Sequence, residues 1–262
     1  MSATNLAPAD LGAELQSDVR RLILSLADTK RLLGIRYSDW LLGAPSIEAG
    51  IAASGMAQDE WGHARLLYAL LKDFGEDPKP VEYDRAPEAY ANCEALDLPA
   101  DDWADLVALM AIVDTALTVL LQAFAEGSYE PAAGRAGKMI AEEDFHGDMA
   151  SAWLRRLGSA SPEGRARIVE ACATRLPRVL AWMAADDASA HRLAEAGILP
   201  VPDEIMRRFV ERQGAALADI GVPMPDPDRT DWDAARGRGP GHPGMEAVER
   251  ARGDLNRELF VE

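Results

Sequence analysis

The amino-acid sequence predicts an all-α protein: a four-helix bundle with additional C-terminal helices, in a single domain that spans residues 1–262. Apolar residues recur at spacings of three, four and seven along four long stretches, which is the period of an amphipathic helix. Glycine and proline punctuate the chain between these stretches, and β-branched runs are few. Two short turns and one long crossover join the four stretches, as in bundles with one long connection.

The four bundle helices are predicted over about residues 11–42, 46–74, 101–126 and 131–157. Gly43 to Ser46 form the first turn, in which Ser46 is suited to cap the second helix because its hydroxyl can accept a hydrogen bond from a free backbone N–H. A proline- and acid-rich connection over about 75–99 crosses to the third helix. Gly127 and Pro131 then separate the third helix from the fourth.

Beyond this core bundle, which spans about residues 11–157, C-terminal helices and an irregular tail are expected over about 158–262. These helices are predicted over about residues 165–196, 203–220 and 245–259. Pro177 lies inside the first of them, where proline removes a backbone hydrogen bond, so we expect a kink there.

Composition excludes several classes of function. The formal net charge of −17 repels nucleic acid and anionic membranes, so neither is expected as a partner. The chain contains no run of about 18 uncharged apolar residues, and its N-terminus lacks a signal-peptide pattern, which favours a cytoplasmic protein. Cys93 and Cys172 are expected to be reduced and buried rather than part of a disulfide or zinc framework.

A lysine interrupts the apolar face of the first predicted helix. Ile23, Leu26, Leu33 and Tyr37 repeat with helical spacing, and Lys30 lies four residues after Leu26 within the same stripe. An unpaired ammonium group inside a core is costly, so an inward Lys30 requires acidic partners. The alternative is that its side chain extends along the helix edge to reach solvent.

The other three bundle helices also carry ionisable residues in the middle of an apolar face. These are Glu60 and His63 on the second helix, Asp114 on the third, and Glu143 and His146 on the fourth. Residues three apart share one face of a helix, so each Glu-x-x-His pair can direct a carboxylate and an imidazole at one point. Two such helices, with carboxylates from two more, make the metal site of ferritin-like bundles. Here Lys30 stands where the first helix is expected to supply a carboxylate.

Several segments resemble the phenylacetic acid catabolic family, the ferritin-like subunits of bacterial phenylacetyl-CoA epoxidase, which is a multicomponent di-iron oxygenase. The stretch APSIEAGIAASGMAQDEWGHARLLYALLKDFG, VDTA at 113–116 and EEDFH at 142–146 are similar to the catalytic subunit. LADTKRLLGIRYSDWLLGAP and the tail WDAARGRGPGHPGMEAVERARGDLNREL are similar to its catalytically silent sister subunit. The chain is therefore interpreted as a hybrid of the two.

The resemblance implies a set of iron ligands and places Lys30 at the position of the family's first glutamate ligand. The implied ligands are Glu60, His63, Asp114, Glu143 and His146, with Glu60 and Glu143 as bridging carboxylates. Imidazole and carboxylate ligands suit iron, and manganese is possible. Trp61 and Phe145 lie inside the two motifs, where packing between helices is expected rather than contact with substrate.

A charge count limits how many ions this site can hold. Three carboxylates give −3 and a protonated Lys30 gives +1, so one divalent ion with neutral imidazoles brings the sum to 0, whereas two ions bring it to +2. With no metal and both imidazoles protonated the sum is again 0. The count favours one ion or none, and the side formed by Asp114, Glu143 and His146 is expected to hold an ion better. If Lys30 lost its proton it would instead serve as a ligand or proton donor, and two ions would be possible.

These observations leave three hypotheses for function. The first is an oxygenase subunit that pairs with another ferritin-like chain, receives electrons from a reductase and acts on an aryl-CoA thioester. Five arginines expected at the bundle surface are candidates to bind the CoA phosphates: Arg20, Arg21, Arg31, Arg36 and Arg65. The second is a metal-free structural subunit in which Lys30 replaces the cofactor and the chain supports a catalytic partner. The third, metal storage, requires a cage-forming assembly, for which the sequence gives no sign. The substrate-binding residues stay unassigned.

Overall fold

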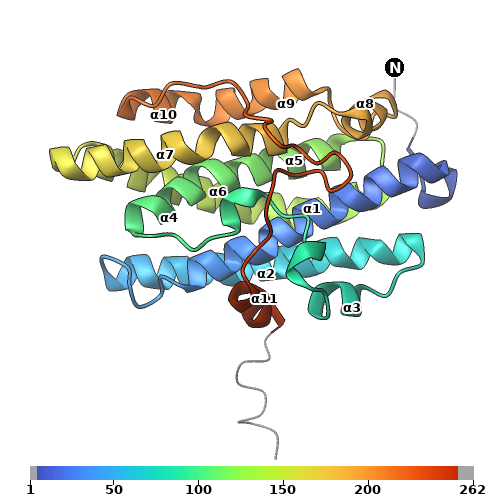
Figure 1. Ribbon diagram of the computed structural model, residues 1–262, viewed down its shortest axis with the longest axis horizontal. Coiled ribbons are helices and arrows are strands. Elements are labelled where there is room, and N and C mark those ends of the chain that lie inside the picture. Colours follow the sequence, from blue (N-terminus) through green and yellow to red (C-terminus); the bar gives the residue numbers. More distant parts are fainter. Residues whose placement is uncertain (1–4, 253–262) are drawn as a thin grey trace, which may run out of the picture.

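The computed structural model describes residues 5–252 and confirms an all-α, ferritin-like four-helix bundle with additional C-terminal helices (Figure 1). The bundle consists of α1 (Ala13–Ser38), α2 (Ile47–Tyr68), α4 and α5 (Trp103–Leu109 and Thr115–Glu126) and α6 (Glu130–Gly158). Helix α1 packs along α2, and α5 packs along α6. The predicted hairpins are therefore present, joined by the predicted crossover.

The helix ends follow the local sequence signals closely. The side chain of Ser46 accepts a hydrogen bond from the backbone N–H of Ala49, which confirms the predicted cap of α2. Helix α1 ends at Ser38, a few residues before the predicted end, and Trp40 continues its last turn by donating its N–H to the Tyr37 carbonyl. Past α2, a 3-10 segment (Ala69–Phe74) carries the chain to the predicted end of the second helix.

The third bundle helix is not uniform, in contrast to the prediction. Between α4 and α5 the chain forms a π-helical turn over Met110–Asp114, and Asp114 is its last residue. A π turn inserts an extra residue into the helical ladder and is frequent at functional sites. Here the π turn sets the direction in which the side chain of Asp114 points.

The C-terminal half corrects one predicted element. The helix expected over about 165–196 is two helices, α7 (Pro162–Met183) and α8 (Ala188–Glu195), because Asp187 caps a new helix by accepting the N–H of Ala190. Pro177 lies inside α7. The chain then forms α9 (Pro202–Phe209), a π turn (Val210–Gly214) and α10 (Ala215–Ile220), in place of one predicted helix.

Two shorter helices complete the described chain. The crossover contains α3 (Pro78–Tyr83), and the last helix is α11 (Met245–Arg252). The predicted continuation of that last helix to residue 259 lies outside the described residues. Helix α7 packs on α4 and α6, α8 on α1, α9 on α5 and α10 on α6, so α7 to α10 add a layer on one side of the bundle, whereas α11 packs on α1 and α3 (Figure 1).

An apolar core surrounds the polar centre of the bundle. The helix Trp103–Glu126 is apolar enough to span a membrane by length and composition, but 94% of its most apolar window is buried inside the protein, as in a core helix. Cys93 and Cys172 are buried free thiols, as predicted. All residues of the predicted Ile23–Tyr37 stripe, Lys30 included, are buried.

Candidate metal centre

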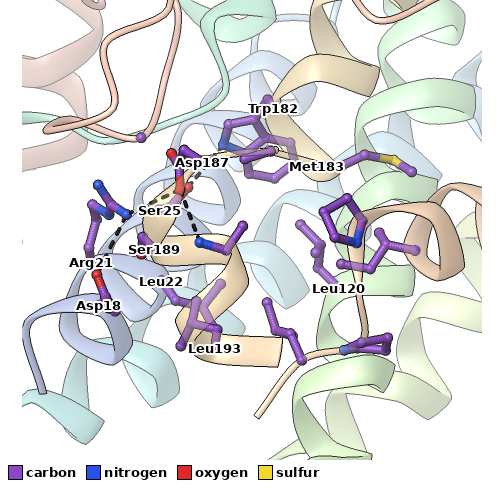
Figure 2. A pocket seen from close by; sticks show the side chains of 17 residues that line it. Asp18, Arg21, Leu22, Ser25, Leu120, Trp182, Met183, Asp187, Ser189 and Leu193 are labelled. Carbon is purple, nitrogen blue, oxygen red and sulfur yellow. Dashed lines mark hydrogen bonds and ion pairs between the residues drawn. The ribbon is translucent and has the colours of Figure 1, made fainter. Parts of the chain in front are cut away.

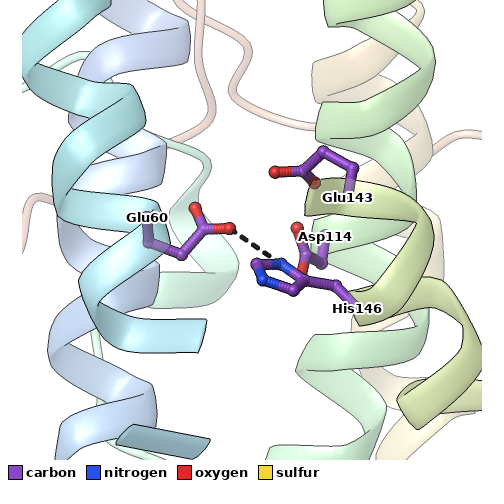
Figure 3. Close-up of side chains that lie close together, drawn as sticks. All are labelled: Glu60, Asp114, Glu143 and His146. Carbon is purple, nitrogen blue, oxygen red and sulfur yellow. Dashed lines mark hydrogen bonds and ion pairs between the residues drawn. The ribbon is translucent and has the colours of Figure 1, made fainter. Parts of the chain in front are cut away.

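The six side chains singled out by the sequence meet in the middle of the bundle. Their exposed fractions are at most 2%: Lys30, Glu60, His63, Asp114, Glu143 and His146. Figure 3 shows Glu60 on α2 facing Asp114, Glu143 and His146 across the bundle. These four offer ligand atoms that lie within 4.8 Å of one another, whereas His63 lies outside this group. Their role as ligands stays a prediction.

Lys30 points inward and lies among the carboxylates. Its Nζ donates to Glu143 Oε1 at 2.6 Å, to Glu60 Oε1 at 2.8 Å and to Asp114 Oδ1 at 3.2 Å. An ammonium group has three N–H donors, so all of them are used. The alternative in which Lys30 reaches solvent along the helix edge is wrong, because its side chain is fully buried.

Each imidazole contacts a carboxylate of the polar centre through one ring nitrogen and an outer carboxylate through the other; the outer carboxylate of the α6 histidine lies on α2, and that of the α2 histidine lies on α6. His146 on α6 directs Nδ1 to Asp114 Oδ2 at 3.0 Å and Nε2 to Asp59 Oδ2 on α2 at 3.5 Å. Reciprocally, His63 on α2 directs Nε2 to Glu142 Oε2 on α6 at 2.8 Å. Such an outer carboxylate fixes the tautomer and ring orientation of a histidine whose other nitrogen faces a metal.

Sequence reasoning missed four residues that shape the centre. The Tyr37 hydroxyl donates to Asp114 Oδ2 at 2.7 Å, and the Thr118 hydroxyl lies 3.0 Å from Glu143 Oε2. The other two are the outer carboxylates of Asp59 and Glu142. A signal was present for both, since Asp59 and Glu142 directly precede Glu60 and Glu143, so the motif reads acid-Glu-x-x-His on each helix.

The electrostatics of the centre keep Lys30 charged. Burial by itself lowers the pKa of Lys30, but the carboxylates of Glu143, Glu60 and Asp114 outweigh it and raise that pKa above its ordinary value. Burial raises the pKa of Asp114, yet Lys30 and His146 together hold that pKa well below its usual range. In this state Lys30 is a cation, not a nitrogen ligand.

The carboxylates around them also raise the pKa of both imidazoles in the absence of metal. Burial lowers the pKa of His146, but the Asp114 carboxylate outweighs burial and raises that pKa to about 11. The pKa of His63 is likewise raised, because its contact with Glu143 outweighs burial. Burial raises the pKa of Glu60 to about 7, even though Lys30 opposes this shift.

With Lys30 protonated, the charges of the donor set suit one divalent ion better than two. Glu60 Oε2 is buried without a hydrogen-bond partner among the described residues, so its lone pairs remain for a ligand, whereas His63 Nδ1 lies 3.0 Å from Glu143 Oε1. Lys30 Nζ, however, holds one oxygen of each of three carboxylates and supplies the charge of half a divalent ion. A second ion would leave two uncompensated positive charges in a dry core.

Comparison with known proteins agrees with this geometry. Residues 4–250 match the family profile described as Phenylacetic acid catabolic protein. The chain belongs to this family. The resemblance drawn from the helix motifs is thereby confirmed over nearly the whole length, including the residues that form the polar centre.

A curated relative connects this family to a named enzyme. This relative is one of the subunits of 1,2-phenylacetyl-CoA epoxidase from Escherichia coli (strain K12), and it is 25% identical over 195 residues. The alignment covers 72% of the present chain and 63% of that protein, so less than two thirds of the relative is matched.

The arginines considered for CoA phosphates are mostly committed to the fold. Arg31 is 6% exposed and bound to Glu82, and Arg36 is 3% exposed and donates to the Leu96 carbonyl, so both are corrected from surface to interior positions. Their guanidinium groups tie the crossover to α1. The remaining candidates lie nearer the surface: Arg20 is paired with Glu76, Arg21 lies near Asp18 and Asp187, and Arg65 is exposed.

The two aromatic residues inside the motifs differ. Trp61 packs against Gly34 of α1, where an added Cβ would lie 2.5 Å from the indole nitrogen, so the packing prediction is confirmed. The same prediction is wrong for Phe145, which is 58% exposed and lies edge-on to His146 at 6.5 Å between ring centroids. It is on the outer face of α6, one residue away from the inward face.

A cavity elsewhere in the bundle does not qualify as the substrate site. Figure 2 shows it between α1, α5, α7 and α8, with Leu22, Leu120 and Trp182 in its walls. Its volume is about 80 Å³, whereas pockets for drug-sized ligands measure about 300–1,000 Å³. An acyl-CoA cannot enter it.

Proposed function

We propose that this chain is a cytoplasmic subunit of a multicomponent oxygenase of the phenylacetyl-CoA epoxidase type, acting on an aryl- or acyl-CoA thioester in aromatic-acid catabolism. The observation that supports this proposal is the buried group of Glu60, Asp114, Glu143 and His146 at the centre of a bundle of this family. A group used only for stability has no need of two imidazoles that each carry an outer carboxylate.

One divalent ion, iron or manganese, would be held by Asp114, Glu143 and His146 together with Glu60. When bound, iron would supply the redox chemistry that activates dioxygen. The protein residues hold the charge balance around it: Lys30 keeps a proton at Nζ, and its hydrogen bonds fix the carboxylates of Glu60 and Glu143. Asp59 orients the ring of His146.

The proposal implies further components. A second ferritin-like chain would complete the oligomer, and a reductase would deliver electrons. The −17 net charge of this chain suits association with a basic surface on such a partner.

Metal analysis of the purified chain tests the proposal. We expect about one ion per chain after growth with excess iron and manganese, no metal in Glu143→Ala, and loss of metal in His146→Ala but not in the matched His63→Ala. Comparing the two histidine variants distinguishes the two sides of the centre, because each variant removes the imidazole of one of the two Glu-x-x-His motifs. Unchanged metal content in Glu143→Ala would refute the site assignment.

A metal-free structural subunit is the second candidate. It is favoured by one observation, the three hydrogen bonds of Lys30, which leave the centre neutral without metal when both imidazoles are protonated. Under this hypothesis the wild-type chain contains no metal, co-purifies with a second ferritin-like chain, and gains metal binding in Lys30→Glu.

A further inference from the structure

Three tryptophans form a layer at the end of the bundle nearest the α1–α2 turn. Trp40 and Trp103 lie edge to face with ring centroids 6.0 Å apart, and Trp103 and Trp153 do so at 5.0 Å. Only 6% of the chain is aromatic, and these are three of its six tryptophans. We call Trp40, Trp103 and Trp153 the tryptophan layer.

Tyr37 connects this layer to the polar centre. Its hydroxyl donates to Asp114 at 2.7 Å, and its ring lies edge-on to His146 at 6.4 Å between centroids. Trp40 follows one turn later and donates its N–H to the Tyr37 carbonyl at 3.2 Å. The two residues are therefore linked through one backbone turn, in which residues three apart have Cβ atoms about 5–6 Å apart.

The opposite end of the layer reaches the surface. Trp153 is 7% exposed and lines an open groove of about 360 Å³ between α2 and α6, together with Ala52 and Met149. The guanidinium group of Arg156 lies 4.7 Å from the centroid of the Trp153 ring. Aromatic side chains therefore follow one another from the centre to solvent.

Packing alone does not explain why the middle residue is tryptophan. Trp103 Nε1 is buried and has no hydrogen-bond partner among the described residues. A buried N–H without an acceptor is destabilising, and a phenylalanine at this position would avoid that loss. An indole without an acceptor also keeps its proton when it is oxidised, so the radical cation stays a strong oxidant that passes the charge on instead of trapping it.

We propose that Tyr37, Trp40, Trp103 and Trp153 form a relay that carries one-electron oxidising equivalents from the polar centre to the surface. This inference rests on the proposed function, which supplies the oxidising equivalent when dioxygen is activated without productive turnover. One electron moves inward from Trp153 through Trp103 and Trp40 to Tyr37 and then to the centre, which is reduced by one electron.

The proton and the surface step are also accounted for. While Tyr37 is oxidised, its phenol proton stays within the 2.7 Å hydrogen bond to Asp114, and it is back on the phenol oxygen when Trp40 re-reduces the tyrosyl radical. At the groove, a small thiol reductant gives one electron to Trp153 and one proton to the solution and is oxidised to a thiyl radical, which restores Trp153. The relay thus removes a damaging oxidant without consuming a residue.

The relay can be tested in the reverse direction in the metal-free chain. A ruthenium polypyridyl photo-oxidant is attached to Ala152→Cys, an exposed position beside Trp153; both native cysteines are buried, so labelling is selective. After flash oxidation with a sacrificial electron acceptor and rapid freezing, electron paramagnetic resonance is expected to show a tyrosyl radical that is absent in Tyr37→Phe.

The decisive comparison is between two tryptophan variants. Trp103→Phe is expected to lower the tyrosyl yield at least about 10-fold, whereas Trp182→Phe, a buried tryptophan outside the relay, leaves it unchanged. Thermal melting verifies that both variants fold. An equal tyrosyl yield in Trp103→Phe, or no Tyr37 radical in the labelled parent, would overturn the relay. Because no metal takes part in this experiment, its failure leaves the proposed function intact, and a failure to bind metal leaves the relay result unchanged.

Discussion

Replacing Lys30 by glutamate is the most informative perturbation of the centre. In the metal-free chain the charges of Lys30, three carboxylates and two imidazolium rings sum to 0, and Lys30→Glu changes that sum to −2. Removing one partner of a buried ion pair costs about 3–5 kcal/mol. For a chain of this size about 2–4 °C of melting temperature corresponds to 1 kcal/mol, so metal-free Lys30→Glu should melt roughly 10 °C below the parent.

Metal should reverse this loss. With four carboxylates and neutral imidazoles, two divalent ions bring the sum in Lys30→Glu to 0, so the number of ions per chain should rise to two. Free ion at 100 times its dissociation constant adds about 2.7 kcal/mol for each site. Elemental analysis and calorimetric melting, with and without chelator, measure both effects in the same samples.

Two control variants separate the causes. Lys30→Met removes the ammonium group without adding a ligand, so it should be destabilised without gaining an ion. Lys79→Glu makes the same charge change on an exposed side chain of α3, away from the centre, and it should alter neither property. A metal-free Lys30→Glu that melts with the parent, or that binds no more metal than the parent, refutes the reasoning.

The remaining predictions concern protons and packing. Because the pKa of His146 is raised from 6.5 to about 11, the stabilisation from its charged ring is complete below pH 6.5 and is lost as the pH rises through 11, which melting of the metal-free chain should show. A metal ion must displace the protons of the imidazoles, so the apparent affinity for metal should rise with pH. The increase should reach up to about 100-fold per pH unit where two protons are released, and calorimetric titration measures it. Gly127→Ala should destabilise the chain by roughly 1–3 kcal/mol, because the added Cβ would lie 2.1 Å from the Ile198 carbonyl oxygen. Gly55→Ala, in open space on α2, should instead be neutral or stabilising by less than about 1 kcal/mol.

Helical period alone predicted which face of each bundle helix is buried. Ile23, Leu26 and Tyr37 lie on the core face of α1, and this phase correctly placed Lys30 inside it. The break between α7 and α8 was not predicted, because apolar periodicity continues across it while Asp187 caps a new helix. The π turn that ends at Asp114 was also missed, since a single inserted residue changes neither composition nor average period.

The composition of the centre was predictable, but its connections were not. Sequence spacing placed each carboxylate and imidazole on an inward face, which was enough to bring all six side chains together. The contacts of His63 with Glu142 and of His146 with Asp59 depend on how far α2 and α6 are shifted relative to each other along their axes. The residue pattern of one helix does not determine that shift. The same holds for Tyr37, which the stripe placed in the core without indicating that its hydroxyl meets Asp114.

Under the proposed function, charge neutrality would allow one lysine to change the metal requirement without unfolding the bundle. With Lys30 in place the centre is neutral in two states: with both imidazoles protonated and no metal, and with both neutral and one divalent ion. One divalent ion therefore replaces two protons, and neither state leaves an uncompensated charge in the core. A glutamate at this position would give the metal-free centre a net charge of −2. Metal would then be needed to neutralise the buried charge, so folding and metal binding would depend on each other. Under the proposed function Lys30 would separate them, which is the physical property expected of a subunit that has to be stable before metal binds.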